Sequence, residues 1–412
     1  MTLLEELRWR ELLYDVTDPE LEEKLENDQL TFYVGADPTA GSLHVGHLIS
    51  YLVSKRLQDR GHHPILVIGG GTGLIGDPSG RSTERSLLTL NESLENAEKI
   101  TRQVKNILPD AEVVNNYEWI SKYDIITFLR DIGKHFNINY MMSKDSVKSR
   151  LDQGISFTEF SYQIIQSLDF MHLYKEHNCT VQIGGQDQWG NITAGLELIR
   201  KVLGHDKKGY GFTWPLLTKA DGTKFGKTAG GAIWLDKDLT SVYEFYQYWI
   251  NTSDSDAVRY LKKFTFYSVE ETKEIIETFL KEPHKRLAQH KIAETLTTLV
   301  HSKEAYESAV RISEALFSGD VASLSKEEIA EGFKDVPSFE FSSEMNLVDA
   351  LIQTKLASSK REAREFIKNN AVAINGEKQQ DVDFIIKKDD AIEQLYTVLR
   401  RGKKKYALIR HL

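Results

Sequence analysis

A strand, a glycine-rich loop, a helix and a second strand follow one another between residues 30 and 68, and this order constrains the fold more than any other feature. Leu30–Val34 and Pro64–Ile68 are short apolar runs of strand type, and His44–Leu57 carries apolar side chains at helical spacing. Two strands joined through a helix make a parallel crossover unit. Ligands of such sheets bind at the carboxyl ends of the strands, so the sequence predicts an α/β fold with its site at one edge of the sheet.

The rest of the chain divides into regions of different texture. Further apolar runs at Ala111–Val114 and Val181–Ile183 extend the sheet, whereas residues 236–332 show long helical periodicity. Residues 334–345 lack clear periodicity and are interpreted as a linker. We therefore predict a Rossmann-like parallel-sheet domain over residues 1–222, a loop and helical domain over 223–333, and a small α+β domain over 346–412.

Charge is distributed unevenly along the 412 residues. The whole chain has a net charge of −9, but residues 346–412 hold 14 Lys and Arg against 9 Asp and Glu. This stretch is therefore +5, and the preceding part is −14. A small basic module appended to an acidic body indicates a nucleic-acid-binding part.

Cysteine use and apolar patterning restrict the compartment. Cys179 is the single cysteine, which excludes an intramolecular disulfide and a cysteine-based metal cluster, and no metal site is expected. The amino terminus lacks the basic start and apolar run of a secretory signal, and no apolar stretch is long enough to span a bilayer. We expect a cytoplasmic protein with no membrane role.

Two glycine-containing stretches imitate common nucleotide-binding motifs. Gly71–Gly76 matches the dinucleotide fingerprint after a strand, but Asp77-Pro78 prevents a helix from opening there, which argues against a nicotinamide oxidoreductase. Residues 226–228 (Gly-Lys-Thr) end like a phosphate-binding P-loop, but Asp221 stands where that motif requires its first glycine.

Two other stretches have the chemistry to bind phosphate groups. Residues 44–47 (His-Val-Gly-His) place two imidazoles three residues apart at the start of a helix, where backbone N–H groups also project. Residues 224–228 (Lys-Phe-Gly-Lys-Thr) offer two ammonium groups and a hydroxyl on a glycine-containing loop. Each stretch alone could be an ordinary core or surface feature. Together they resemble the signature pair of the class I aminoacyl-tRNA synthetases.

Longer motifs narrow the resemblance to the bacterial tyrosyl-tRNA synthetase family. These are residues 33–39 (Tyr-Val-Gly-Ala-Asp-Pro-Thr), 76–80 (Gly-Asp-Pro-Ser-Gly), 184–191 (Gly-Gly-Gln-Asp-Gln-Trp-Gly-Asn) and 218–223 (Thr-Lys-Ala-Asp-Gly-Thr). The resemblance covers essentially the whole chain. It implies a tyrosine–tRNA ligase that activates L-tyrosine with ATP and Mg²⁺, releases pyrophosphate, and transfers tyrosine to the 3′-terminal adenosine of tRNA(Tyr).

The resemblance also implies roles for single residues. Those expected to stabilise the leaving pyrophosphate are His44, His47, Lys224, Lys227 and Thr228, with Arg81 and Arg85 adding charge nearby. Those that match tyrosine-binding positions are Tyr33, Asp77, Tyr162, Gln166, Asp169 and Gln188. Those that match adenylate-binding positions are Gly35, Asp37, Thr39, Ser50, Asp187 and again Lys227, with Ser50 standing where relatives often carry threonine.

The spacing of three of these residues gives independent support. Tyr162, Gln166 and Asp169 fall at i, i+4 and i+7, so one face of a helix presents a phenol, an amide and a carboxylate. Such a face lines a pocket or lies in solvent. A pocket with buried polar groups for a hydroxyl would reject phenylalanine, an argument for which this enzyme family is itself the standard example.

The basic tail looks like an S4-type RNA-binding domain, in which residues 358–364 open a helix and residues 372–376 form a strand and turn. Its candidate RNA contacts are Lys360, Arg361, Arg364, Arg400, Arg401, Lys403, Lys404 and Lys405. In the family, the insertion at about 115–156 forms a two-fold interface, so we expect a homodimer. The alternation in residues 136–140 could equally be a half-buried extended stretch of core.

Other functions fit the sequence less well than this one. A nucleotidylyltransferase with the same histidine signature gives no reason for the basic tail, and a catalytically idle RNA-binding protein gives no reason for the retained signature residues. A tryptophan-specific synthetase is the nearest alternative. Tyr33 and Asp169 favour a phenol over an indole.

Overall fold

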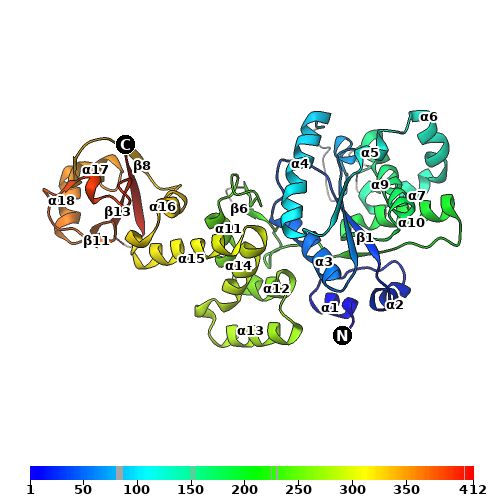
Figure 1. Cartoon of the computed structure of the whole chain (residues 1–412), viewed down its shortest axis with the longest axis horizontal. Helices are drawn as coiled ribbons and strands as arrows, with labels where there is room; N and C mark the ends of the chain where they lie inside the picture. Colours follow the sequence, from blue (N-terminus) through cyan, green and yellow to red (C-terminus); the bar gives the residue numbers. More distant parts are fainter. Residues whose placement is uncertain (80–86, 149, 152–153, 224, 229–230, 403) are drawn as a thin grey trace. The chain divides into compact units, whose positions relative to one another are not determined.

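The computed structural model describes residues 1–79, 87–148, 150–151, 154–223, 225–228, 231–402 and 404–412. The chain divides into two compact units, which are residues 1–240 with 248–300, and residues 241–247 with 301–412 (Figure 1). The region 223–333, predicted as one loop and helical domain, is thus divided after Val300. The reason is packing, because α14 (Leu287–Val300) contacts helices of the first unit and α15 (Lys303–Ser318) contacts α16 (Lys326–Gly332) of the second.

A five-stranded parallel sheet lies at the centre of the first unit and confirms the predicted α/β class. Its strands are β1 (Thr31–Ala36), β2 (His63–Ile68), β3 (Glu112–Asn115), β4 (Cys179–Gly185) and β5 (Tyr210–Trp214), in the order β3-β2-β1-β4-β5. The apolar runs predict the first four. They miss β5, whose five residues are all buried but include a glycine and a threonine.

Helices cover both faces of this sheet (Figure 1). On one face lie α3 (Leu48–Asp59) and α4 (Leu90–Ile107), and on the other lie α9 (Phe157–Glu176) and α10 (Trp189–Leu203). The remaining helices of the unit are α1 (Leu3–Trp9), α2 (Glu20–Asn27), α5 (Tyr117–Ile120), α6 (Ile125–Thr127), α7 (Ile138–Met142), α8 (Asp145–Lys148), α12 (Asp254–Phe264) and α13 (Val269–Lys281). Its shorter turns include η1 (Val45–His47), η2 (Thr72–Leu74) and η5 (Gln186–Gln188), and α11 (Val242–Ile250) belongs partly to each unit.

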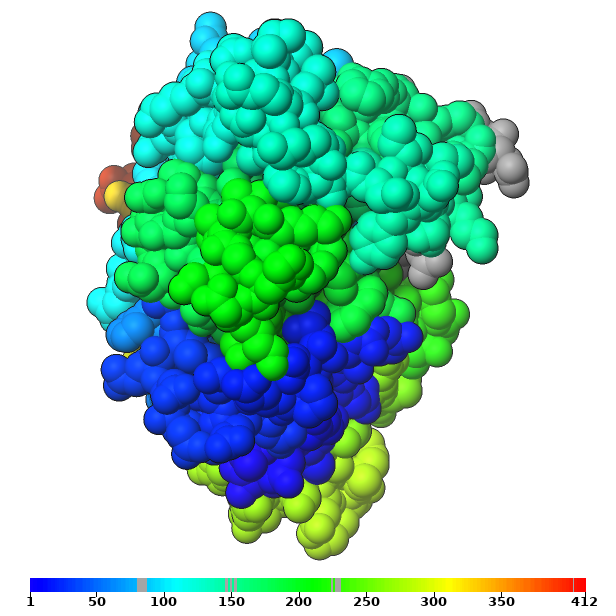
Figure 2. Space-filling model, turned by 90° about the vertical axis from the view of Figure 1, so that its right-hand side faces the viewer, coloured from blue at the N-terminus to red at the C-terminus, as the bar shows by residue number. Residues whose placement is uncertain are grey.

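The insertion between β3 and α9 forms short helices, where one alternative had predicted an extended stretch. Asn137 caps α7, because its side chain accepts a hydrogen bond from the backbone N–H of Tyr140 at 3.1 Å. The alternative of a half-buried extended segment at 136–140 is therefore wrong. Ile138 and Tyr140 lie at the surface instead, and Figure 2 shows the turquoise segment that contains them on the upper part of one face.

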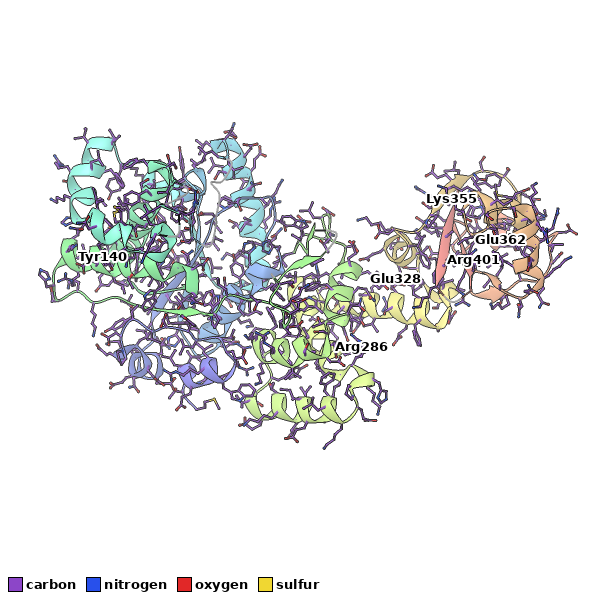
Figure 3. The ribbon with its side chains drawn as sticks, turned by 180° about the vertical axis from the view of Figure 1, so that it is seen from behind. Tyr140, Arg286, Glu328, Lys355, Glu362 and Arg401 are labelled. Atoms are coloured by element: carbon purple, nitrogen blue, oxygen red, sulfur yellow. The ribbon has the colours of Figure 1, made fainter. Side chains whose placement is uncertain are left out.

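The second unit has its own sheet and core. The sheet order is β11-β10-β13-β14-β8, with β13 (Tyr396–Arg401) and β14 (Lys405–His411) forming a central antiparallel hairpin. The other strands are β10 (Val372–Ile374), β11 (Glu377–Lys378) and β8 (Ser338–Phe341), and β9 (Met345–Asn346) pairs with β12 (Ile385–Ile386). Helices α17 (Leu347–Gln353) and α18 (Lys360–Lys368) pack on this sheet (Figure 3).

The interpretation of residues 334–345 as a linker is wrong. Residues 338–341 form β8, which pairs in parallel with β14 and completes the edge of the second unit's sheet. Phe339 and Phe341 point to the core, whereas Ser338 and Glu340 are exposed. This alternation spans only four residues, which is too short to predict a strand from the sequence. The strand is recognised by its pairing with β14 in the folded protein. None of the described helices is long and apolar enough to cross a membrane.

Candidate active site

The candidate site lies where the strand order of the first unit reverses, between β1 and β4. In an open parallel sheet this reversal leaves a crevice at the carboxyl ends of the two strands. Gly35 lies near the end of β1, with Asp37 and Thr39 in the following loop, and the chain leaves β4 through η5, which contains Asp187 and Gln188. Five predicted adenylate- and tyrosine-binding residues therefore meet at this edge.

The two signature histidines hold each other and the backbone in one arrangement. Nδ1 of His44 accepts from the N–H of Gly46 at 3.0 Å, and Nδ1 of His47 accepts from the N–H of His44 at 3.2 Å. The ring centroids are 4.0 Å apart. Because each Nδ1 is an acceptor, the proton of a neutral ring is on Nε2, so each ring has its N–H donor at that atom. Such donors suit a phosphate oxygen.

The second signature packs against the first. Gly226 adopts φ +80°, and a Cβ at this position would lie 3.1 Å from Cγ2 of Val45 and 3.2 Å from the backbone N of Gly46. Glycine is therefore required both for the backbone conformation and for the close approach. Residues 227–228 form the short strand β6, which pairs with β7 (Gly231–Ala232). The side chains of Lys227 and Thr228, and the whole of Lys224, Arg81 and Arg85, lie outside the described residues.

A buried carboxylate, Asp169, and a buried phenol, Tyr33, interact electrostatically within the candidate site. Asp169 is 3% exposed, and its two carboxylate oxygens accept hydrogen bonds from Trp119 Nε1 at 2.8 Å and Asn116 Nδ2 at 2.9 Å. Burial raises the pKa of Asp169 to about 7, although both hydrogen bonds oppose the shift. The hydroxyl of Tyr33 is buried and has no hydrogen-bond partner among the described residues. Burial, and then the charge of Asp169, raises the pKa of this phenol.

A buried hydroxyl without a hydrogen-bond partner destabilises the folded protein unless a bound ligand supplies the partner. A ligand hydroxyl at this point could donate to Asp169 and accept from Tyr33. The pair therefore has the chemistry to select a molecule that carries a phenol.

A chain of amides links two other predicted residues, Gln188 and Gln166, to the carboxylate of Asp77. Gln188 Nε2 donates to Asp77 at 2.7 Å, and Gln166 Nε2 donates to Gln188 Oε1 at 3.1 Å. Asn191 Nδ2 contacts both acceptor oxygens, at 2.9 Å on Gln166 and 3.2 Å on Gln188. Asp77 itself is 8% exposed and also accepts from the backbone N–H of Ser79. The fixed carboxylate suits an ammonium group.

Asp37 links the loop after β1 to α9 and to η2. Its two carboxylate oxygens accept from Thr72 Oγ1 at 2.7 Å and from the hydroxyl of Tyr162 at 2.9 Å. Burial, followed by the charge of Asp77, raises the pKa of Asp187 to about 6. Ser50 lies in the first turn of α3, just after the signature histidines, and is half-buried. The carboxylates of the candidate site thus lie where the amino acid is expected to bind. Its hydrogen-bond donors for phosphate are the N–H groups of the two histidines.

Sequence reasoning missed residues that hold the site residues in place. Asn116 and Trp119 fix Asp169, and Thr72 fixes Asp37 and accepts from Asn116 at 2.9 Å. A signal for Asn116 exists, because it follows the end of β3 at the same edge of the sheet. The stretch 71–76 that imitates a dinucleotide motif contains the short turn η2.

The predicted RNA-binding residues of the second unit divide into two groups. Arg361, Arg364, Lys404 and Lys405 are exposed, and Lys360 is exposed but contacts Asp349 at 2.8 Å. Arg400 and Arg401 are partly buried. The guanidinium of Arg400 packs on Gly319, and Arg401 donates to the carbonyl of Leu356 at 2.7 Å and lies 4.0 Å from Glu362 (Figure 3). Lys403 lies outside the described residues.

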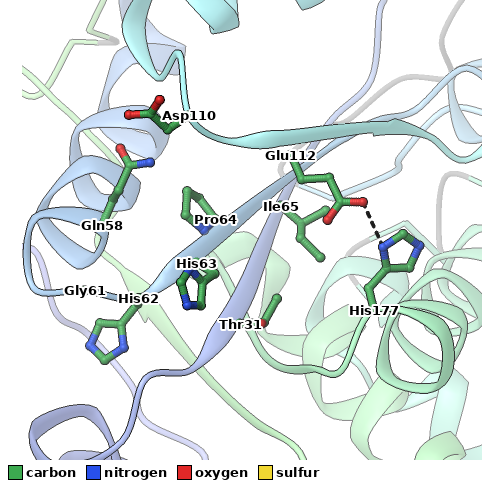
Figure 4. A pocket seen from close by; sticks show the side chains of 10 residues that line it. All are labelled: Thr31, Gln58, Gly61, His62, His63, Pro64, Ile65, Asp110, Glu112 and His177. Carbon is green, nitrogen blue, oxygen red and sulfur yellow. Dashed lines mark ion pairs between the residues drawn. The ribbon is translucent and has the colours of Figure 1, made fainter.

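A separate hollow of about 490 Å³ opens at the amino end of the strands (Figure 4). Thr31, His63 and Glu112 each begin or adjoin the start of a strand there, and His177 Nδ1 lies 2.9 Å from Glu112. None of the predicted site residues lines this hollow. The candidate site is the crevice at the opposite edge.

The comparisons with known proteins agree with this geometry. Residues 25–318 match the family described as tRNA synthetases class I (W and Y), and residues 328–409 match the tyrosine–tRNA ligase SYY-like C-terminal domain. The chain belongs to the class I tRNA synthetase family. The tyrosine–tRNA ligase of Bacillus velezensis is 56% identical to it over 416 residues, and tyrosine–tRNA ligase 1 of Bacillus subtilis is 55% identical, with 99% of each chain covered in both cases.

Among solved structures, a C-terminally truncated mitochondrial tyrosyl-tRNA synthetase of Aspergillus nidulans is similar to this class I synthetase. The TM-score is 0.69 at 32% identity, and the match covers 77% of this chain and 94% of that one. The predicted fold and family are therefore confirmed.

Proposed function

We propose that this class I synthetase charges tRNA with tyrosine in two steps. The buried pair of Tyr33 and Asp169 is the observation that supports tyrosine as the substrate. The hydroxyl of Tyr33 has no hydrogen-bond partner among the described residues. The phenol of tyrosine completes both groups. Tyrosine's ammonium group binds near Asp77, Tyr162 and Gln166, whose carboxylate, hydroxyl and amide line the same crevice.

The first step joins tyrosine to AMP. A carboxylate oxygen of tyrosine forms a bond to the α-phosphorus of ATP, the bond from that phosphorus to the bridging oxygen breaks, and pyrophosphate leaves. The tyrosine carboxylate is already ionised, so no general base is required. The Nε2–H groups of His44 and His47 stabilise the negative charge on the leaving pyrophosphate, with Lys224, Lys227 and Thr228 of the adjoining loop. Mg²⁺ enters with ATP and neutralises phosphate charge.

The second step transfers tyrosine to RNA. A hydroxyl of the 3′-terminal adenosine of tRNA(Tyr) forms an ester bond with the tyrosyl carbonyl carbon, and AMP leaves. We place the reaction in the cytoplasm, where these substrates occur. The test is aminoacylation of tRNA(Tyr) by the purified full chain with labelled tyrosine and ATP. Acid-precipitable label that depends on all three components supports the proposal, and label found only with another amino acid refutes it.

The second unit contributes affinity for tRNA through the exposed face of α18. Replacing Arg361 and Arg364 by alanine should leave tyrosine-dependent pyrophosphate exchange unchanged but lower charging efficiency about tenfold, because two phosphate contacts are lost. The slope of log KM for tRNA against log salt should also fall by about 2. The double variant Lys175→Ala/Lys207→Ala removes two exposed charges from the first unit and is the control. Equal effects in both variants would contradict the assignment.

Dimerisation rests on an exposed apolar surface of the insertion. The exposed large apolar side chains on or beside it are Ile125, Ile126, Leu129, Ile138, Tyr140, Met142, Leu151 and Phe157. Large exposed apolar side chains that gather in one segment mark an interaction site in soluble proteins. A second copy of the chain is the occupant that the family resemblance implies, and Figure 2 shows the face that carries the insertion.

Introducing charge on this surface should separate the two copies. The double variant Ile126→Asp/Ile138→Asp is expected to sediment with the mass of one chain while the wild type sediments with the mass of two, because a buried unpaired carboxylate is strongly unfavourable. Leu280→Asp, at a similarly exposed apolar side chain of α13, is the matched control and should stay dimeric. A wild type with the mass of one chain would refute the dimer.

A further inference from the structure

The lysine-containing signature loop is fixed at its exit by the segment before the histidines. The N–H of Val45 donates to the carbonyl of Ile233 at 2.9 Å, and the N–H of Leu235 donates to the carbonyl of Leu43 at 2.8 Å. The chain leaving the loop therefore pairs with the chain entering the first signature.

Phe225, the second residue of the signature at 224–228, is buried among aromatic rings, which we call the aromatic box. It is 7% exposed, and its ring centroid lies 5.2 Å from Tyr260, 5.3 Å from Phe264 and 6.0 Å from Trp249. The ring is stacked on Phe264 and meets Tyr260 edge to face. Such a set of ring contacts confines an aromatic side chain much more than a solvated turn would.

Two polar contacts attach the same loop to the same part of the first unit. Asp256 Oδ1 accepts from the backbone N–H of Ala220 at 2.7 Å, at the entrance to the loop, and the Asp256 side chain is itself held by Ser253 Oγ at 2.8 Å. The backbone of Gly226 hydrogen-bonds the Tyr248 hydroxyl. Asp256 and the box residues Tyr260 and Phe264 all belong to α12, so one helix holds both the entrance and the centre of the loop.

We propose that Phe225, seated in its box on α12, is a positioning residue for tyrosine activation, because it sets the distance of the Gly226–Lys227 backbone from the signature histidines. This inference rests on the proposed function. It assigns to Phe225 no contact with a substrate. Its effect passes through Gly226, whose backbone touches Val45 and Gly46, and a displacement of about 1 Å at a reacting group can lower a rate on the order of 100-fold.

The experiment measures adenylate formation in a single turnover and tyrosine binding without ATP, in the full chain. Phe225→Ala should lower the rate constant for tyrosyl-adenylate formation by about 10- to 100-fold while the dissociation constant of tyrosine changes by less than about twofold. Phe225→Met conserves most of the side-chain volume and should restore the rate to within about threefold of wild type. Phe279→Ala, at a phenylalanine of α13 that is 1% exposed, controls for lost core stability.

The pattern of the three variants separates positioning from stability. A rate that falls in Phe225→Ala, recovers in Phe225→Met and stays at the wild-type value in Phe279→Ala supports the inference. A wild-type rate in Phe225→Ala overturns it, and so does an equal loss of rate in Phe279→Ala. If the wild type forms no adenylate with tyrosine, the proposed function fails instead.

Discussion

Replacing Asp169 by asparagine should lower kcat/KM for tyrosine activation on the order of 1,000-fold or more, because the phenol loses an anionic acceptor in a buried site. Each carboxylate oxygen of Asp169 now receives one hydrogen bond, from Trp119 and from Asn116. An amide cannot accept both, so one of these donors also loses its partner. The measurement is the steady-state rate of pyrophosphate exchange at varied tyrosine concentration.

The same substitution should change the dependence of tyrosine binding on pH. Burial raises the pKa of Asp169 to about 7, above its usual range, so the ionised form that accepts a hydrogen bond from the phenol is depleted as the pH falls through 7. The dissociation constant of tyrosine should therefore rise about tenfold from pH 8 to pH 6 in the wild type. It should stay flat over this range in Asp169→Asn. If the dissociation constant of tyrosine in the wild type does not change with pH, the carboxyl of Asp169 does not bind the phenol.

Replacing Lys227 by alanine should lower the rate of tyrosyl-adenylate formation on the order of 100- to 1,000-fold, while tyrosine binds almost unchanged. The residue follows Gly226, whose backbone lies against Val45 and Gly46, and the proposed function assigns its charge to the leaving pyrophosphate. Stabilisation there develops in the transition state and affects the rate constant more than the binding of the amino acid.

Lys237→Ala is the control for this prediction. It removes an exposed lysine just beyond the loop, and its rate should equal that of the wild type. Pre-steady-state measurement of adenylate formation separates the two variants. A normal rate in Lys227→Ala, or an equal loss in Lys237→Ala, would remove Lys227 from the mechanism.

The sequence predicts the site well where local pattern determines position. The run before Gly35 predicts β1, and the spacing of Tyr162, Gln166 and Asp169 predicts one face of α9, so these residues could be placed without a structure. Asn116 and Trp119 could not be identified as partners of Asp169 in this way, although the place of Asn116 directly after β3 follows from the pattern. Their hydrogen bonds to Asp169 join residues about 50 positions apart, and such pairings depend on how β3 and α9 pack.

The remaining errors have the same physical origin. β8 is recognised as a strand only through its pairing with β14, and β5 is buried on both faces, so neither shows a long alternating pattern. Arg401 looks like part of an RNA-binding cluster in the sequence, yet its guanidinium lies over Phe366 and bonds the carbonyl of Leu356. Charge predicts a basic surface, but only the fold decides which basic side chains remain exposed on it.

Tyrosine selection is the central claim, and exchange of labelled pyrophosphate into ATP tests it most directly. The purified full chain is assayed separately with each of the twenty amino acids. Exchange should occur with tyrosine and fall by about four orders of magnitude with phenylalanine, which cannot complete Tyr33 and Asp169. Exchange that depends on tryptophan, or on no amino acid at all, would contradict the account.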